Sequence, residues 1–431
     1  MIKKHTSYLV LVFLFFIFSI KAQSEFKFYG TNNNVQSIRF QLINNLIVIP
    51  VDVNGSHLSF ILDTGVDKTI LFNISQIDSV GLNNVKKITL QGLGGGAPIE
   101  ALLSQKNNIK IKSYISTNEN IYVILRDKFD VSSKMGTTIH GVIGYRLLKD
   151  AITEINYNTK KIYFHNPKTF KSPKCRKCEV FPLQFYRNKP YINAKVQLDT
   201  IGNVKTAVKL LIDTGGGDAI WLFENTKAAI KTPKRSFRDI LGEGFSGTIY
   251  GNRSRIKELS IGRFSIKNPT VSFLDSASTY YARQFKTRNG SIGGNILKRF
   301  KVWIDYQNKQ ITLKKSGSFR GGFDYNMSGV DVVYNGKILV KELENILVGE
   351  FYTNQSKSRF NTISFISNYQ FRFKPSYIIH EVLKGSPGGI AGLQKGDIIS
   401  KINGEHTHQF SLKQLLGKLQ ERHNKRIKMV V

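Results

Sequence analysis

Cysteine, acidic side chains and long apolar runs are all scarce in this chain, and each shortage excludes a class of protein. The cysteines are Cys175 and Cys178 alone, which are too few for a tetrahedral zinc site, and no histidine cluster completes them. Beyond the N-terminus no apolar stretch approaches the roughly 20 residues that a membrane-spanning helix needs. We therefore expect no metal, no cofactor and no stable membrane span.

The shortage of acidic residues gives the chain a strong positive charge. Aspartate and glutamate number 30 against 63 lysines and arginines, for a formal net charge of +33. Such a charge predicts attraction to anionic surfaces or acidic partners. No zinc finger, stacked-aromatic signature or basic helix accompanies the local excesses at residues 231–238 and 422–428. We expect a solvated basic surface and no nucleic-acid partner.

The one long apolar run lies at the N-terminus. Lys3 and Lys4 precede the apolar residues 8–20, and small residues follow them. This order is typical of a secretory signal peptide, here residues 1–22. An uncleaved anchor is the alternative, disfavoured because the run is shorter than a membrane span. We expect export to the periplasm or the extracellular space and a soluble, monomeric mature chain.

Cys175 and Cys178 form a C-x-x-C pair. A thiol redox protein could use such a pair, but the surrounding sequence lacks the βαβ pattern that a redox site of this kind requires. We favour either a short local disulfide or two free thiols in a linker.

Two Asp-Thr-Gly triplets stand 150 residues apart, at Asp63-Thr64-Gly65 and Asp213-Thr214-Gly215. Each follows an apolar run that predicts a strand, and the Asn54-Gly55 pair ahead of the first run predicts a tight hairpin turn. A carboxylate at the end of a strand, entering a glycine turn, is exposed and rigidly aimed. Two such carboxylates that face each other can hold one water and share one proton.

The repeat extends beyond the triplets. Gly92 and Gly94 recur as Gly242 and Gly244, in glycine-rich segments at residues 91–96 and 241–247. Two further landmarks keep their order: a Gly before a short helical pattern, at residues 144 and 293, and the matching segments 155–162 and 304–311. The chain therefore carries two copies of one lobe of about 140 residues, which is large enough to hold its own core.

With these residues in place, the chain resembles the retropepsin-like (pepsin-type) aspartic proteases over residues 35–315. Retroviral members build their site from two identical subunits, so the resemblance implies a pseudo-dimer of two β-barrel lobes fused in one mostly β chain. A lone Asp-Thr-Gly is an ordinary β-turn sequence. Two triplets in matched repeats favour the catalytic interpretation.

The resemblance implies a role for each conserved position of the motif. Asp63 and Asp213 would be the catalytic dyad, and the two threonines would hydrogen-bond across the lobe interface. The glycine-rich segments would be flap hairpins that close over an extended polypeptide, with plain flexible loops as the alternative. Substrate binding would involve Thr64, Gly65, Thr214, Gly215, Gly94 and Gly244.

The residue after each triplet departs from the pepsin-like pattern. Val66 and Gly216 stand where a hydroxyl commonly donates to the neighbouring carboxylate, and the loss of such a bond raises a carboxylate's pKa. The basic surroundings act in the opposite direction. We expect activity to extend to weakly acidic or near-neutral pH.

A different module begins past residue 316. Residues 385–404 include Gly385-Ser386-Pro387 and Asn403-Gly404 and resemble the most recognisable stretch of PDZ domains. In that family a loop before a strand holds the carboxylate of a C-terminal peptide, and Ser328, Gly329 and Val330 would form it here. Residues 331–372 exceed the usual spacing, so a rigid domain that packs on the protease is the alternative.

The sequence thus predicts five segments: a signal peptide at 1–22, an N-terminal aspartic protease lobe at 25–167, a linker at 168–182, a C-terminal lobe at 183–316 and a PDZ domain at 317–431. The expected function is an aspartic-type endopeptidase, a hydrolase whose partners are its polypeptide substrate and a C-terminal peptide at the PDZ domain. The alternative is a non-catalytic peptide-binding scaffold that uses the PDZ domain.

Overall fold

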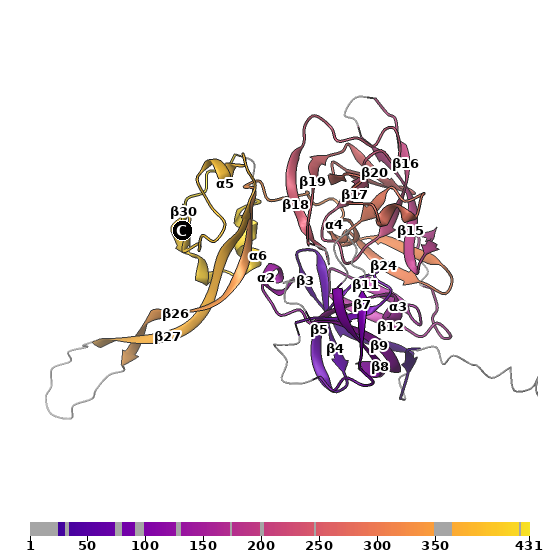
Figure 1. The fold of residues 1–431 in the computed structure, drawn as a ribbon, viewed down its shortest axis with the longest axis horizontal. Helices are drawn as coiled ribbons and strands as arrows, with labels where there is room; N and C mark the ends of the chain where they lie inside the picture. The colour runs from indigo at the N-terminus through magenta and orange to yellow at the C-terminus, as the bar shows by residue number, and fades with distance from the viewer. Residues whose placement is uncertain are drawn as a thin grey trace, which may run out of the picture.

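The computed structural model describes residues 25–30, 34–73, 80–90, 99–125, 131–172, 175–198, 202–244, 247–348, 364–421 and 424–431. Strands dominate, and they gather into two lobes and a smaller C-terminal domain from which a long hairpin projects (Figure 1). The predicted signal peptide lies outside the described residues. The mostly β fold class is confirmed.

The first lobe is one sheet whose strands follow the order β1-β9-β6-β10-β5-β4-β8-β7, with β3 beside β4. Asn54 and Gly55 both have positive φ and join β4 to β5, as the hairpin signal predicted. The strands are β1 (Lys27–Phe28), β3 (Gln41–Ile43), β4 (Leu46–Val53), β5 (Ser56–Leu62), β6 (Thr69–Leu71), β7 (Lys86–Leu90), β8 (Ile99–Ile111), β9 (Tyr114–Ile124) and β10 (Gly141–Ile143).

The second lobe repeats this arrangement in the order β18-β19-β22-β17-β23-β16-β15-β20-β21, with β14 beside β15. Its strands are β14 (Gln184–Tyr186), β15 (Lys189–Gln197), β16 (Thr206–Ile212), β17 (Ile220–Phe223), β18 (Phe237–Gly244), β19 (Gly247–Arg255), β20 (Glu258–Ile261), β21 (Phe264–Lys267), β22 (Thr270–Leu274) and β23 (Gly290–Ile292); a short helix, η2 (Ala282–Gln284), precedes β23.

One element of the repeat positions the site in both lobes. The strand that ends just before each Asp-Thr-Gly lies parallel to a short strand that ends just before a Gly: β5 beside β10, and β16 beside β23. A one-turn helix follows in each case, α3 (Tyr145–Leu148) and α4 (Gly294–Leu297), where the sequence predicted it. The described part of the first lobe also contains the helix α2 (Val131–Met135).

A third sheet joins the lobes in the order β13-β25-β24-β11-β12-β2. It consists of β2 (Val35–Arg39), β11 (Ile152–Asn156), β12 (Lys161–His165), β13 (Cys178–Pro182), β24 (Phe300–Asp305) and β25 (Gln310–Lys315). The two matched segments of the repeat meet here, since Ile155 pairs with Val302 across β11 and β24. Their apolar side chains belong to one buried cluster that spans both lobes.

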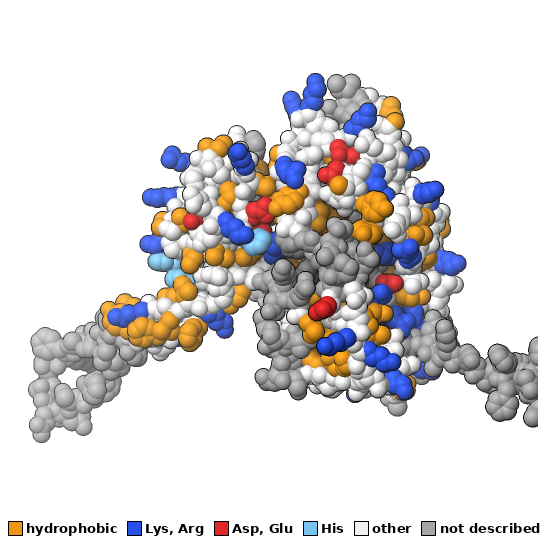
Figure 2. Space-filling model, viewed as in Figure 1, with side chains coloured by type: hydrophobic (Ala, Val, Ile, Leu, Met, Phe, Trp, Pro, Cys, Tyr) orange, Lys and Arg blue, Asp and Glu red, His pale blue; other side chains and the backbone are white. Residues whose placement is uncertain are grey.

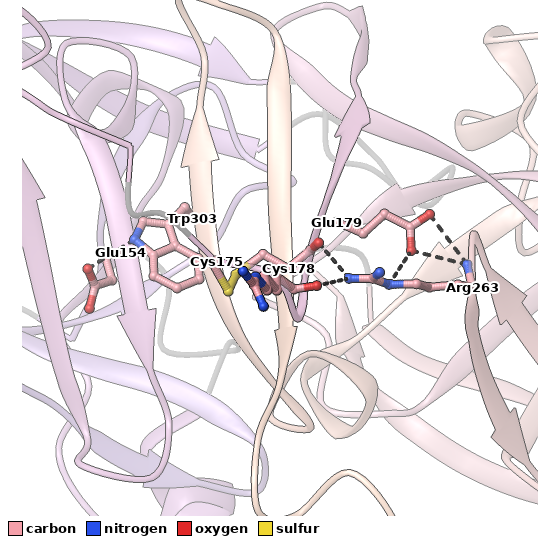
Figure 3. Close-up of a disulfide and its surroundings, with 7 residues drawn as sticks. Glu154, Cys175, Cys178, Glu179, Arg263 and Trp303 are labelled. Carbon is pink, nitrogen blue, oxygen red and sulfur yellow. Dashed lines mark hydrogen bonds and ion pairs between the residues drawn. A yellow bond between two sulfur atoms is a disulfide. The ribbon is translucent and has the colours of Figure 1, made fainter.

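The segment between the lobes is more ordered than a linker. Its last five residues form β13 at the edge of the joining sheet. Cys178, the first residue of β13, forms a disulfide with Cys175, so the first of the two states left open by the sequence is the one observed (Figure 3). Arg263 of the second lobe anchors this corner, because its guanidinium donates to the carbonyl of Cys178 (2.6 Å) and pairs with Glu179 (3.3 Å).

The second lobe also extends past the boundary expected at residue 316. The buried Arg299 donates to the carbonyls of Gly321 (2.5 Å) and Gly322 (2.6 Å), and Phe323 packs in the lobe's core. The C-terminal domain follows. Its elements are β26 (Val330–Val348), β27 (Ser364–Val382), α5 (Pro387–Ile390), β28 (Lys401–Ile402), β29 (Glu405–His406), η3 (Thr407–Gln409), α6 (Leu412–Lys418) and β30 (Met429–Val430). They enclose a small core of their own.

Candidate active site

Asp63 and Asp213 are placed by the strands that precede them. The backbone N–H of Asp63 donates to the Ile143 carbonyl at the end of β10 (2.9 Å), and that of Asp213 donates to Ile292 at the end of β23 (3.0 Å). Each aspartate is therefore fixed at the point where its strand leaves the sheet. Both residues remain partly exposed.

The glycines of the triplets bring the two carboxylates together. Gly65 N–H donates to Asp63 Oδ1 (2.6 Å) and Gly215 N–H donates to Asp213 Oδ1 (3.1 Å). A Cβ on Gly65 would lie 3.0 Å from Asp63 Oδ1 and 3.5 Å from Asp213 Oδ1, and a Cβ on Gly215 would overlap the Asp63 carboxylate. The close approach requires glycine at position 215 and leaves a Cβ at position 65 crowded against the carboxylates.

The two threonines tie the lobes together with a reciprocal set of hydrogen bonds. Thr64 N–H donates to Thr214 Oγ1 (3.0 Å), and Thr214 N–H donates to Thr64 Oγ1 (3.1 Å). The hydroxyls in turn donate across the interface, from Thr64 to the Ile212 carbonyl (2.5 Å) and from Thr214 to the Leu62 carbonyl (2.7 Å). Both threonines are fully buried. They hold the triplets in register and contact neither carboxylate through these bonds.

The surroundings disfavour two negative charges at this point. Desolvation, followed by repulsion from Asp213, raises the pKa of Asp63 to about 7. Desolvation also raises the pKa of Asp213, although Arg288 and Lys189 oppose it. One proton shared between the carboxylates is therefore favoured over a wide range of pH.

Lys189 and Arg288 are the site residues that the sequence reasoning missed. Arg288 is buried. Its guanidinium carbon lies 5.0 Å from the centre of the Phe223 ring and 5.8 Å from the centre of the Tyr191 ring, and its Nε donates to the Gly290 carbonyl (3.2 Å). Lys189 is half-buried at the start of β15, and its charge acts on both aspartates. Burial, then repulsion from Arg288, lowers the pKa of this lysine.

The repeat itself contained the signal for these cations. Lys189 follows the two-residue turn between β14 and β15, and Leu46 follows the equivalent turn between β3 and β4. Arg288 stands two residues before β23, and Ile139 stands two residues before β10. The second lobe therefore places two cations where the first has aliphatic side chains. Arg288 lies 149 residues after Ile139, the spacing that the repeat also keeps between Gly144 and Gly293, whereas Lys189 lies 143 residues after Leu46 and is aligned only by the pairing of strands.

The glycine-rich segments fall partly within the described residues. Gly242 and Gly244 belong to the hairpin of β18 and β19, in which Gly244 pairs with Gly247 and a bulge precedes Gly242. Gly92 and Gly94 lie outside the described residues. A flap role for either segment stays a prediction.

In the predicted carboxylate-binding loop, backbone N–H groups donate to side chains of the same segment. Ser328 N–H donates to Asn326 Oδ1 (3.0 Å), and Val330 N–H donates to Ser328 Oγ (3.2 Å). Gly329 has positive φ, and its carbonyl accepts the N–H of Leu383 (2.9 Å). Val330 is buried in the domain core. In this state the loop's N–H groups at 328 and 330 already have partners, and peptide capture at Ser328, Gly329 and Val330 stays a prediction.

The C-terminal domain docks on both lobes. On the first lobe, α2 packs beside β26, Lys134 Nζ lies 3.2 Å from Asp331 Oδ2, and a Cβ on Gly136 would lie 3.0 Å from Leu412 Cβ at the start of α6. On the second lobe, the Tyr250 hydroxyl of β19 donates to Glu381 (2.5 Å). The segment around α2 therefore contacts β26 and α6. A peptide ligand of a PDZ domain would bind between these two elements, as an added strand beside β26.

The described residues contain no group of three or more His, Cys, Asp or Glu side chains arranged to hold a metal ion. Within the same residues, no helix is long and apolar enough to cross a membrane.

Comparison with known proteins assigns the two kinds of domain. Residues 49–147 match the family model described as aspartyl protease, and residues 378–431 match that of the PDZ domain. No curated protein matches the chain. A solved structure of the aspartic proteinase from Irpex lacteus is 14% identical, covering 67% of this chain and 99% of that one, with a TM-score of 0.46. The two family-model matches confirm the predicted resemblance to aspartic proteases with a C-terminal PDZ domain.

Proposed function

We propose that this chain, which joins an aspartyl-protease-like domain to a PDZ domain, is an aspartic-type endopeptidase that cleaves extended polypeptides. The observation that carries the proposal is the paired geometry of the triplets. Two carboxylates from matched strands meet at one point, each held by its own glycine N–H. The buried threonines lock that meeting point across the lobes. A scaffold that only bound peptides would not require this arrangement.

The electrostatic asymmetry suggests which carboxylate takes which role. Lys189 acts on both carboxylates, but Arg288 opposes the rise in the pKa of Asp213 more strongly than any other group, whereas repulsion from Asp213 helps to raise the pKa of Asp63 to about 7. Asp213 then accepts a proton from the attacking water while Asp63 donates its proton to the carbonyl oxygen of the peptide bond. The resulting diol collapses when Asp213 passes its proton to the leaving nitrogen and Asp63 recovers one from a diol hydroxyl. The C–N bond breaks without a metal or a covalent intermediate.

The PDZ domain is the second part of the proposal. A substrate or partner with a free C-terminus would add to β26 beside α6. Because α2 and Gly136 pack against these elements, the peptide would compete with the first lobe for the same surface. We also propose that the chain is exported, on the pattern of its first 22 residues.

The proposal is tested by incubating the purified mature chain with a mixed peptide library at acidic to neutral pH, with and without a statine-type inhibitor. The expected result is a set of internal cleavages, read by mass spectrometry, that the inhibitor abolishes. Absence of cleavage on any peptide, together with peptide binding that the inhibitor leaves unchanged, would favour the non-catalytic scaffold instead.

A further inference from the structure

The two longest strands of the molecule extend beyond the PDZ core. After the bulge at Tyr334, β26 and β27 remain paired from Lys337 opposite Pro375 to the far end of both strands. They form a ribbon that projects away from the rest of the chain (Figure 1). We call its part with described side chains, residues 337–343 and 369–375, the arm.

One face of the arm is apolar and exposed. Three cross-strand pairs share this face, because directly opposed residues point to the same side of a sheet. The pairs join Leu339 to Phe373, Lys341 to Phe371, and Leu343 to Tyr369. The five apolar members are between 53% and 69% exposed, a high value for aromatic and leucine side chains. Figure 2 shows apolar side chains exposed along this part of the chain.

The opposite face is mixed and partly covered by the PDZ body: Ile338 and Val340 lie there beside Lys374 and Arg372. Val340, Glu342 and Gln370 are only half-exposed there, and His406 and His408 line the same hollow. Glu342 pairs with Lys374 (3.0 Å) across the strands. The arm therefore has two unlike faces, as a ribbon at the boundary between a polar and an apolar medium would have.

The described side chains of the apolar face offer little area to a second copy of this chain. Aromatic side chains offer roughly 150–250 Å² each, so the three aromatic residues and two leucines of the arm, each a little over half exposed, present on the order of 500 Å² or less. That falls below the roughly 800 Å² per partner of a stable protein interface. Two copies docked through this face would also bring together two Lys341 side chains on chains of net charge +33.

The composition and charge fit a lipid surface. Phenylalanine, tyrosine and leucine partition into the interfacial region of a bilayer. Lys341 lies among them with its ammonium 3.8 Å from the centre of the Tyr369 ring, so its stem can rest on apolar surface while its charge reaches a phosphate. The net charge of +33 attracts the rest of the chain to negative headgroups.

We propose that the apolar face of the arm docks the protein on the surface of an anionic phospholipid bilayer. The arm lies on the membrane and does not cross it, and the protease lobes remain in water. This surface is independent of Asp63 and Asp213, so an experiment that refuted membrane docking would not contradict the proposed peptidase activity.

The test is flotation of the purified mature chain with vesicles of phosphatidylcholine, alone or mixed with phosphatidylglycerol. The first variant is Phe371→Ser with Phe373→Ser. The matched control is Val340→Ser with Gln370→Ser, which changes the opposite face and leaves the net charge the same. We expect binding to the mixed vesicles that falls at least about tenfold in the first variant and stays near the parent value in the control.

A second variant keeps the test valid if the first one folds poorly. Phe371→Trp places an indole on the apolar face, and its emission should shift to the blue when mixed vesicles are added. Val340→Trp on the opposite face should not show this shift. Equal binding by parent and first variant would mean that charge alone attracts the protein, and the proposal would be wrong. Absence of vesicle binding, or a dimer that only the Phe371 and Phe373 changes dissociate, would also overturn it.

Discussion

The reciprocal threonine bonds make a strong prediction about stability. Thr64→Val keeps the shape of the side chain but removes its hydroxyl. The bond from Thr64 Oγ1 to the Ile212 carbonyl and the bond it accepts from the Thr214 N–H are then both lost. A buried hydrogen bond contributes about 1 kcal/mol net, and a buried group left without a partner costs about 1–3 kcal/mol. We expect the variant to be less stable by about 2–5 kcal/mol.

The chain offers a matched control for this change. Thr153 is also fully buried, in β11, but its hydroxyl has no hydrogen-bond partner among the described residues. Thr153→Val removes the same atom without breaking a bond, so it should be neutral within about 0.5 kcal/mol or stabilising. Thr64→Ser keeps the hydroxyl and should recover part of the loss.

Denaturant unfolding followed by tryptophan fluorescence measures the effect. The two tryptophans are Trp221 in β17 and Trp303 in β24, so the signal reports the protease lobes and not the PDZ domain. If Thr64→Val unfolds at the same denaturant concentration as Thr153→Val, the threonine bonds do not hold the lobes together, and the reasoning about the interface is wrong.

Three further predictions concern the chemistry and the PDZ domain. Lys189→Leu removes a positive charge that lowers the pKa of Asp213, so the acid limb of the pH–rate profile should move to higher pH by roughly one unit; an unmoved limb would show that the lysine does not act on the dyad. Gly216→Ser should move the same limb to lower pH, because a Cβ there lies 3.3 Å from Asp213 Oδ2 and its hydroxyl can donate to the charged carboxylate; a limb at higher pH in this variant contradicts the expected bond. A chain ending at residue 324 should cleave short peptides at similar turnover and lose efficiency on long substrates with a free C-terminus, whereas loss of short-peptide cleavage in a folded truncation would show that the domain supports the site.

The sequence predicted the parts of the site that repeat. The Asp-Thr-Gly triplets, the glycines before α3 and α4, and the Asn54-Gly55 turn are local signals, because each depends on a few neighbouring residues and a specific backbone conformation. Their spacing was enough to pair Asp63 with Asp213. The C-terminal domain was recognised on the same basis, from the turn and helix signals at residues 385–404.

What the sequence did not predict depends on contacts between distant segments. Lys189 and Arg288 are close to the dyad because β15 and β23 flank β16, and neither residue belongs to a motif that indicates an active site. The strand β13 was taken for part of a linker because its partner, β25, lies more than 120 residues further along the chain. The docking of α2 on β26 likewise joins residues that no local pattern connects.

The measurement that tests the central claim most directly is the hydrolysis rate of Asp63→Asn and of Asp213→Asn, each compared with the exposed-site control Asp275→Asn on the best peptide from the library. The account predicts that either dyad variant loses hydrolysis altogether while its fold, followed by tryptophan fluorescence, stays intact, and that the control keeps the parent rate. Near-full activity in either dyad variant would contradict the shared-proton mechanism and with it the proposed function.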